Sequence, residues 1–124
     1  MGTFAVPVIL TNPRHPERRL TLDLLVDTGA TWTLLTDEVA KQLGLATPWE
    51  RSVTLASGDR VTYAKGEVVM RLNGEELTTV FLAGPPGAVG LLGAVTLEQF
   101  GVAPDPVKKT LVPVDGLLAA SAPR

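Results

Sequence analysis

Leu24-Leu25-Val26-Asp27-Thr28-Gly29-Ala30-Thr31 is the most informative stretch of this 124-residue sequence. It is an apolar run that ends in a single carboxylate and is followed at once by a glycine turn. Residues 20–27 predict a strand whose even-numbered leucines and valine share one face, so Asp27 leaves the strand on the other face. An isolated ionised carboxylate is costly in such an apolar setting. Asp27 therefore needs hydrogen-bond donors, a cation or a second carboxyl group with which to share a proton.

A second apolar segment, Gly90-Leu91-Leu92-Gly93, lies far downstream. Residues 89–92 predict a short strand, and residues 94–100 predict a short helix that ends at Gly101. Taken alone, the segment indicates a core strand and no chemistry. Its meaning depends on whether the fold brings it to Asp27.

The rest of the chain predicts short strands separated by turns, which favours a mainly β domain over residues 1–114. One helix is expected to start at Thr36, bury Val39 and Leu43, and end at Gly44. Hairpin turns are expected at Ser57-Gly58-Asp59 and Asn73-Gly74. Residues 115–124 are predicted to be a flexible tail. The other predicted strands cover residues 4–10, 32–35, 51–56, 60–64, 67–72, 77–83 and 107–114.

Composition and charge exclude several function classes. The formal net charge of −2 and the scattered basic residues argue against nucleic-acid binding. No apolar segment is long enough to cross a membrane, and the N-terminus lacks the pattern of a signal peptide, so we expect a cytoplasmic protein. The absence of cysteine removes disulfides, thiolate nucleophiles and Cys-based metal sites. The only histidine, His15, is expected in an exposed loop, so neither a metal nor a cofactor is expected.

The two apolar segments together resemble a known family. Asp27-Thr28-Gly29-Ala30 after an apolar run resembles the active-site signature of aspartic proteases of the single-domain retroviral type. Gly90-Leu91-Leu92-Gly93 before a helix resembles the second signature of that family, and residues 97–113 resemble its bacterial members. The likeness, which runs from residue 4 to residue 112, implies a small closed β barrel with a flap hairpin and one or two short helices.

The resemblance implies roles for the matching residues. Asp27 is the expected catalytic carboxylate, and the Thr28 hydroxyl is expected to tie the two halves of the site together. The residues expected to support the site are Thr28, Gly29, Ala30, Leu91, Leu92 and Gly93. Those expected in the substrate-binding flap are Ala56, Ser57, Gly58 and Asp59.

The chemistry implied by the family requires two neighbouring carboxylates, one ionised to activate a water and one protonated to polarise the scissile amide. The sequence carries the signature once. Two copies of Asp27 must therefore meet across a twofold axis, so we expect a homodimer that cleaves extended peptides or proteins.

Three positions depart from the retroviral pattern. Retroviral enzymes commonly carry acidic residues where this chain has Thr31 and Trp32, and an arginine where it has Ala94. In the retroviral pattern these acidic residues bind the substrate backbone and pair with the arginine. Both partners of that ion pair are absent here, which indicates that this chain holds substrate through different residues.

Other interpretations remain open at this level. The chain could be a peptide- or protein-binding module of the same dimeric fold with little or no turnover, or a domain that mainly dimerises a larger assembly. Asp27 could simply form an Asx turn at the end of its strand. Asp105 is interpreted as a turn residue, and the alternative is that it is one carboxylate of a glycosidase-like pair. Trp32 and Trp49 are interpreted as core or rim aromatics in preference to ligand platforms.

Overall fold

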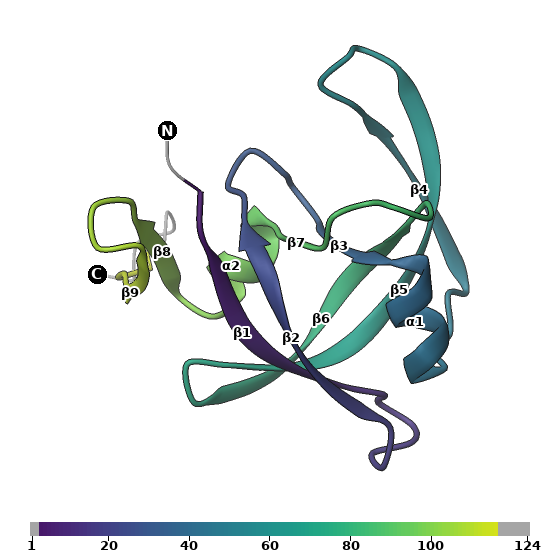
Figure 1. Cartoon of the computed structure of the whole chain (residues 1–124), viewed down its shortest axis with the longest axis horizontal. Coiled ribbons are helices and arrows are strands. Elements are labelled where there is room, and N and C mark those ends of the chain that lie inside the picture. The colour runs from purple at the N-terminus through teal and green to yellow at the C-terminus, as the bar shows by residue number, and fades with distance from the viewer. Residues whose placement is uncertain (1–2, 117–124) are drawn as a thin grey trace, which may run out of the picture.

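The computed structural model describes residues 3–116, in which strands dominate (Figure 1). The predicted mainly β class is confirmed. The helices are α1 (Asp37–Leu43) and α2 (Ala94–Gln99). The strands are β1 (Ala5–Thr11), β2 (Arg19–Val26), β3 (Thr33–Thr36), β4 (Trp49–Thr54), β5 (Arg60–Leu72), β6 (Glu75–Gly84), β7 (Leu91–Leu92), β8 (Val102–Asp105) and β9 (Thr110–Pro113).

Six of these strands form a closed ring. The sheet order is β1-β2-β7-β3-β6-β5-β4, and an additional pairing of β1 with β5 closes the ring and leaves β4 outside it. The core inside the ring is apolar and contains Leu10, Leu24, Met70 and Phe81, all with no exposed surface. The expected closed barrel is therefore present as a ring of strands.

The hairpin of β4 and β5 projects from this ring like an arm (Figure 1). β4 pairs with residues 60–65 of β5, whereas residues 64–72 of β5 pair with β6. The prediction of two separate strands over residues 60–64 and 67–72 is wrong, because β5 is continuous. Gly66 stays in register opposite Phe81, and a Cβ there would lie 2.2 Å from the Ala46 carbonyl oxygen. The glycine thus marks a close approach of backbone, not a break, and the arm is continuous with the barrel wall.

The predicted boundaries of α1 are confirmed by its caps. The Thr36 hydroxyl accepts a hydrogen bond from Val39 N at 3.2 Å, and Gly44 ends the helix with φ +65°. The Asn73-Gly74 turn is also confirmed, because both residues have the positive φ that a tight hairpin requires.

The predicted last strand over residues 107–114 is present only as β9, and its first three residues are wrong. The chain instead forms the β8–β9 hairpin, and residues 106–109 are its turn. Asp105 organises this turn, since its Oδ1 accepts hydrogen bonds from Val107 N at 3.0 Å and Lys108 N at 3.2 Å. Asp105 is therefore a turn residue, as expected. Of the predicted tail, residues 117–124 lie outside the described residues.

A chain of buried hydroxyls runs through the barrel near one end of the ring. Gly93 N donates to Thr33 Oγ1 at 3.1 Å, and Thr33 Oγ1 donates to Thr96 Oγ1 at 2.6 Å. Thr79 Oγ1 donates to Gln99 Oε1 at 2.6 Å, so its single proton is used, and Thr96 must donate to Thr79 across their 2.8 Å contact. All protons therefore point the same way along the chain, an arrangement in which each bond polarises the next.

Thr33→Val tests the contribution of this chain to stability. The substitution keeps the side-chain shape but leaves Gly93 N–H without its acceptor, so we expect the free energy of unfolding to fall by about 2 kcal/mol. Urea unfolding at one fixed protein concentration measures it. Thr62→Val is the matched control, because the Thr62 hydroxyl contacts Ser52 on the exposed surface of the arm and its loss should change stability by less than about 0.5 kcal/mol. Equal losses in the two variants would contradict the role of the buried chain.

Candidate active site

Asp27 follows β2 directly, and its backbone is held on both sides. Asp27 N donates to Leu92 O at 3.1 Å, and Asp27 O accepts from Ala30 N at 3.2 Å. The carboxylate Oδ1 accepts from Gly29 N at 3.0 Å. The Asx turn considered at the sequence level is thus present, and it orients a half-buried carboxylate that faces a cleft.

The two signature segments lie side by side, as the sequence analysis expected. β7 runs parallel to β2, with Leu91 opposite Leu25 and Leu92 opposite Val26. Leu92 has no exposed surface. Gly93 is required where the two segments meet, because a Cβ there would lie 2.5 Å from the carbonyl carbon and oxygen of Trp32.

The loop after Asp27 also supplies the N-terminal partners of α2. Ala94 N donates to Ala30 O at 2.8 Å, and Val95 N donates to Thr31 O at 3.0 Å. The N-cap position of α2 is Gly93, which has no side chain to make such a bond. The loop therefore satisfies N–H groups that a helix start otherwise leaves unpaired, and the helix fixes the loop in return.

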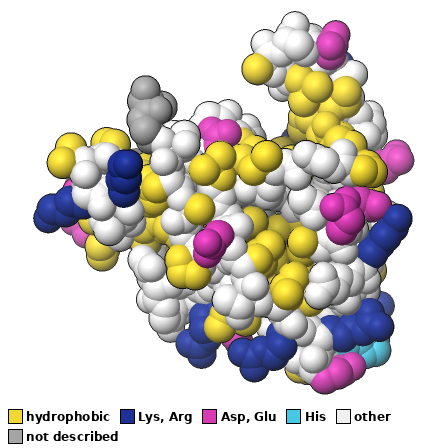
Figure 2. Space-filling view, viewed as in Figure 1, with side chains coloured by type: hydrophobic (Ala, Val, Ile, Leu, Met, Phe, Trp, Pro, Cys, Tyr) yellow, Lys and Arg dark blue, Asp and Glu magenta, His cyan; other side chains and the backbone are white. Residues whose placement is uncertain are grey.

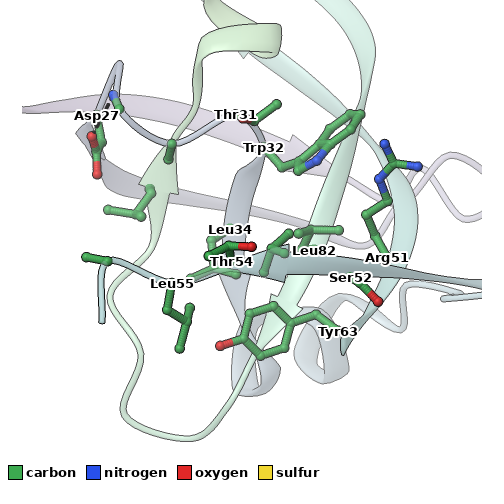
Figure 3. Close-up of a pocket in the computed structure, with 15 residues that line it drawn as sticks. Asp27, Thr31, Trp32, Leu34, Arg51, Ser52, Thr54, Leu55, Tyr63 and Leu82 are labelled. Atoms are coloured by element: carbon green, nitrogen blue, oxygen red, sulfur yellow. Dashed lines mark hydrogen bonds between the residues drawn. The ribbon is translucent and has the colours of Figure 1, made fainter. Parts of the chain in front are cut away.

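A cleft of about 600 Å³ lies between the Asp27 loop and the arm. Asp27 is at one end, and Trp32 and Arg51 are at the other, with Leu34 and Leu82 between them (Figure 3). Apolar side chains continue along the arm where it stands clear of the body (Figure 2). Among residues 3–116, Asp27 is the only carboxylate in the lining. The full lining comprises Asp27, Gly29, Ala30, Thr31, Trp32, Leu34, Arg51, Ser52, Val53, Thr54, Leu55, Ala56, Tyr63, Leu82 and Leu91.

Some of the predicted site residues line the cleft, and the others lie around it. Asp27, Gly29, Ala30, Leu91 and Ala56 line the cleft. Thr28 is exposed beside it, Leu92 and Gly93 are buried behind it, and the predicted flap residues Ser57, Gly58 and Asp59 form the turn at the tip of the arm.

Sequence reasoning missed most of the cleft wall. Trp32, Arg51 and Tyr63 line the cleft, and none of them was among the predicted site residues; Trp32 was interpreted as a core or rim aromatic. The signal available in the sequence was alternation within the predicted hairpin, which places Arg51 and Val53 on one face of the arm. Without the fold, that face could not be assigned to the cleft.

The described chain offers neither a cluster of metal ligands nor a membrane-spanning helix. Residues 3–116 contain no group of three or more His, Cys, Asp or Glu side chains placed to hold a metal ion. In the same range, none of the helices has the length and apolar character needed to span a membrane.

Comparison with solved structures identifies a similar fold. The EIAV protease in complex with the inhibitor HBY-793 superposes with a TM-score of 0.59 at 21% identity, covering 81% of this chain and 89% of that one. At this identity the likeness concerns the fold alone. No curated protein matches the chain. The model of the family described as aspartyl protease matches residues 17–96, which include both signature segments. This chain therefore belongs to the aspartyl protease family and has a retropepsin-like fold.

Proposed function

We propose that this chain is an aspartic endopeptidase that works as a homodimer, with a water activated between the two Asp27 carboxylates. The observation that carries the proposal is the position of Asp27. It is held by backbone hydrogen bonds at one end of a cleft of about 600 Å³, and no other carboxylate of residues 3–116 lines that cleft.

A single Asp27 supplies half of the required chemistry. Hydrolysis of an amide by this route needs a base that takes a proton from water and an acid that gives one to the carbonyl oxygen and later to the leaving nitrogen. Two carboxylates about 3 Å apart cannot both be ionised easily, so such a pair shares one proton and fills both roles. A second copy of the chain is the source of the missing carboxylate.

The surroundings of Asp27 suit such a dimer. Thr28 is exposed, so its hydroxyl is available to a partner copy. Leu91 lines the cleft beside Asp27 and gives that end of it an apolar wall. The arm would cover a peptide lying in the cleft and exclude water from the reaction.

Asp27→Asn tests the catalytic role. The amide cannot act as the base, so we expect the rate of peptide cleavage to fall by at least about 10³-fold while the fold and peptide binding survive. Cleavage is measured with peptide libraries and mass spectrometry, and binding by fluorescence anisotropy. Asp23→Asn is the matched control, since Asp23 is an exposed residue of the same strand outside the cleft and its change should leave the rate within twofold. Equal rates for wild type and Asp27→Asn would refute the assignment. Binding without any wild-type cleavage would favour the binding-module interpretation.

Mixing experiments test the shared site. Sedimentation should show a dimer at micromolar concentration. When Asp27→Asn protein is added in excess to a fixed amount of wild type, mixed dimers should form and cleavage should fall. A control addition of Asp23→Asn protein, which keeps Asp27, should not abolish activity. A strict monomer that cleaves peptides, or activity unaffected by excess Asp27→Asn, would contradict the symmetric dyad.

A further inference from the structure

Arg51 and Trp32 line the end of the cleft opposite Asp27, and a second cation, Lys65, lies against the same indole ring. The Arg51 guanidinium carbon lies 5.4 Å from the centroid of the Trp32 ring, and Lys65 Nζ lies 5.6 Å from the same ring. Lys65 Nζ is also 5.9 Å from the ring of Trp49. These four residues are called the cationic cluster below. At such distances, the rings attract the cations and restrict their positions.

The cluster belongs to the cleft side of the arm. Partners directly opposite each other in an antiparallel pair point to the same face, so Trp49 with Lys65 and Arg51 with Tyr63 share one face. Arg51, Tyr63 and Trp32 all line the cleft. Glu50 is the only carboxylate of β4, and it lies on the opposite face.

The positive charge of the cluster is not neutralised within the described chain. The ion pairs among residues 3–116 do not include Arg51 or Lys65. Glu67 is the nearest carboxylate along the Lys65 face of β5, and it lines an adjoining hollow of about 240 Å³ together with Trp49, but no ion pair joins it to Lys65 in the described chain. A guanidinium stacked on a ring keeps the N–H groups at its edge free to donate, and a carboxylate is the acceptor that matches their geometry.

We propose that the cationic cluster is a specificity site for a carboxylate of the substrate peptide, so that this protease selects peptides with an acidic residue a few positions from the cleaved bond. The inference rests on the proposed function and names its substrate class. Leu34 and Leu82 lie between the cluster and Asp27 (Figure 3), so the residues nearer the cleaved bond are apolar. The cluster occupies the part of the cleft where Trp32 replaces an acidic residue of the retroviral pattern.

Under the proposed twofold symmetry, the preference for an acidic residue applies on both sides of the cleaved bond. Each subunit contributes one cluster, and the two clusters stand at equal distances from the paired Asp27 residues. Substrate chains have no such symmetry, but one acidic residue on either side of the cleaved bond can reach a cluster. A carboxylate can come from a Glu or Asp side chain or from the end of a peptide, and blocked peptides distinguish the two sources.

The experiment uses acetylated and amidated peptides in which one Glu is moved through the positions around an apolar pair, each with a Gln twin. At the favoured position, kcat/KM of the wild-type dimer should be about tenfold higher for Glu than for Gln, as expected for a hydrogen bond between charged groups. The ratio should shrink as salt rises. A preference seen only when the peptide C-terminus is unblocked would overturn the side-chain assignment.

Arg51→Gln combined with Lys65→Gln should bring the Glu to Gln ratio close to one. The matched control combines Arg60→Gln and Arg19→Gln, which removes the same charge from exposed residues outside the cleft and should keep the ratio. Arg51→Lys combined with Lys65→Arg keeps the charge and should retain part of the preference.

Binding separates failure of this inference from failure of the proposed function. The same peptides are titrated against Asp27→Asn protein, with and without the two cluster substitutions. Cleavage with no Glu preference, or with a preference unchanged by Arg51→Gln and Lys65→Gln, would overturn the inference and leave the protease function intact. A Glu preference in binding with no wild-type cleavage would support the cluster and refute turnover. Absence of both cleavage and binding would overturn both.

Discussion

Four backbone hydrogen bonds join the Asp27 loop to the segment that contains β7 and the start of α2, and the site depends on them. Leu25 in β2 donates to Gly90, and Asp27 just after β2 donates to Leu92. The carbonyls of Ala30 and Thr31 accept from the first turn of α2. Backbone bonds of this kind leave little freedom for the loop, so the carboxylate is held by the barrel itself and not by packing of its own side chain. The buried threonine chain extends the same anchorage to β6 and the end of α2.

The arm shows how one strand can serve two structures. The first half of β5 builds the cleft wall with β4, and its second half closes the barrel with β1 and β6. Any movement of the arm must therefore bend β5 near the point where β4 ends its pairing, beside Lys65 and Gly66. The cationic cluster therefore lies at the base of the arm, where β5 also pairs with β6. The turn of Ser57 and Gly58 lies at the far end, where β5 and β4 pair only with each other. Specificity contacts at the base can be precise while the tip remains free to admit a peptide.

A cleft with one carboxylate at one end and cations at the other is asymmetric within the subunit. Pairing two copies through the Asp27 ends would turn it into a longer symmetric groove, with the reaction at its centre and a cationic cluster at each end. Every binding feature of one subunit then acts twice on one substrate chain. Trp32 stands beside Arg51 and Lys65, so the charged side chains in this part of the cleft are cations.

The sequence by itself determined the local features: the strand that ends in Asp27, the capped helix α1, the Asn73-Gly74 turn, the mainly β class and the family likeness of the two signature segments. These depend on residues close together in the chain, where periodicity and turn chemistry act directly.

The predictions were wrong where contacts between distant residues override the local pattern. Gly66 resembles a break but is a close approach to Ala46, and residues 102–113 fold back as a hairpin around Asp105. Only the tertiary structure decided that Arg51, Lys65 and Trp32 meet, because their meeting depends on the register of β4 with β5 and on the side to which the arm folds. Long-range register is set by packing of the whole barrel, which no short stretch of sequence encodes.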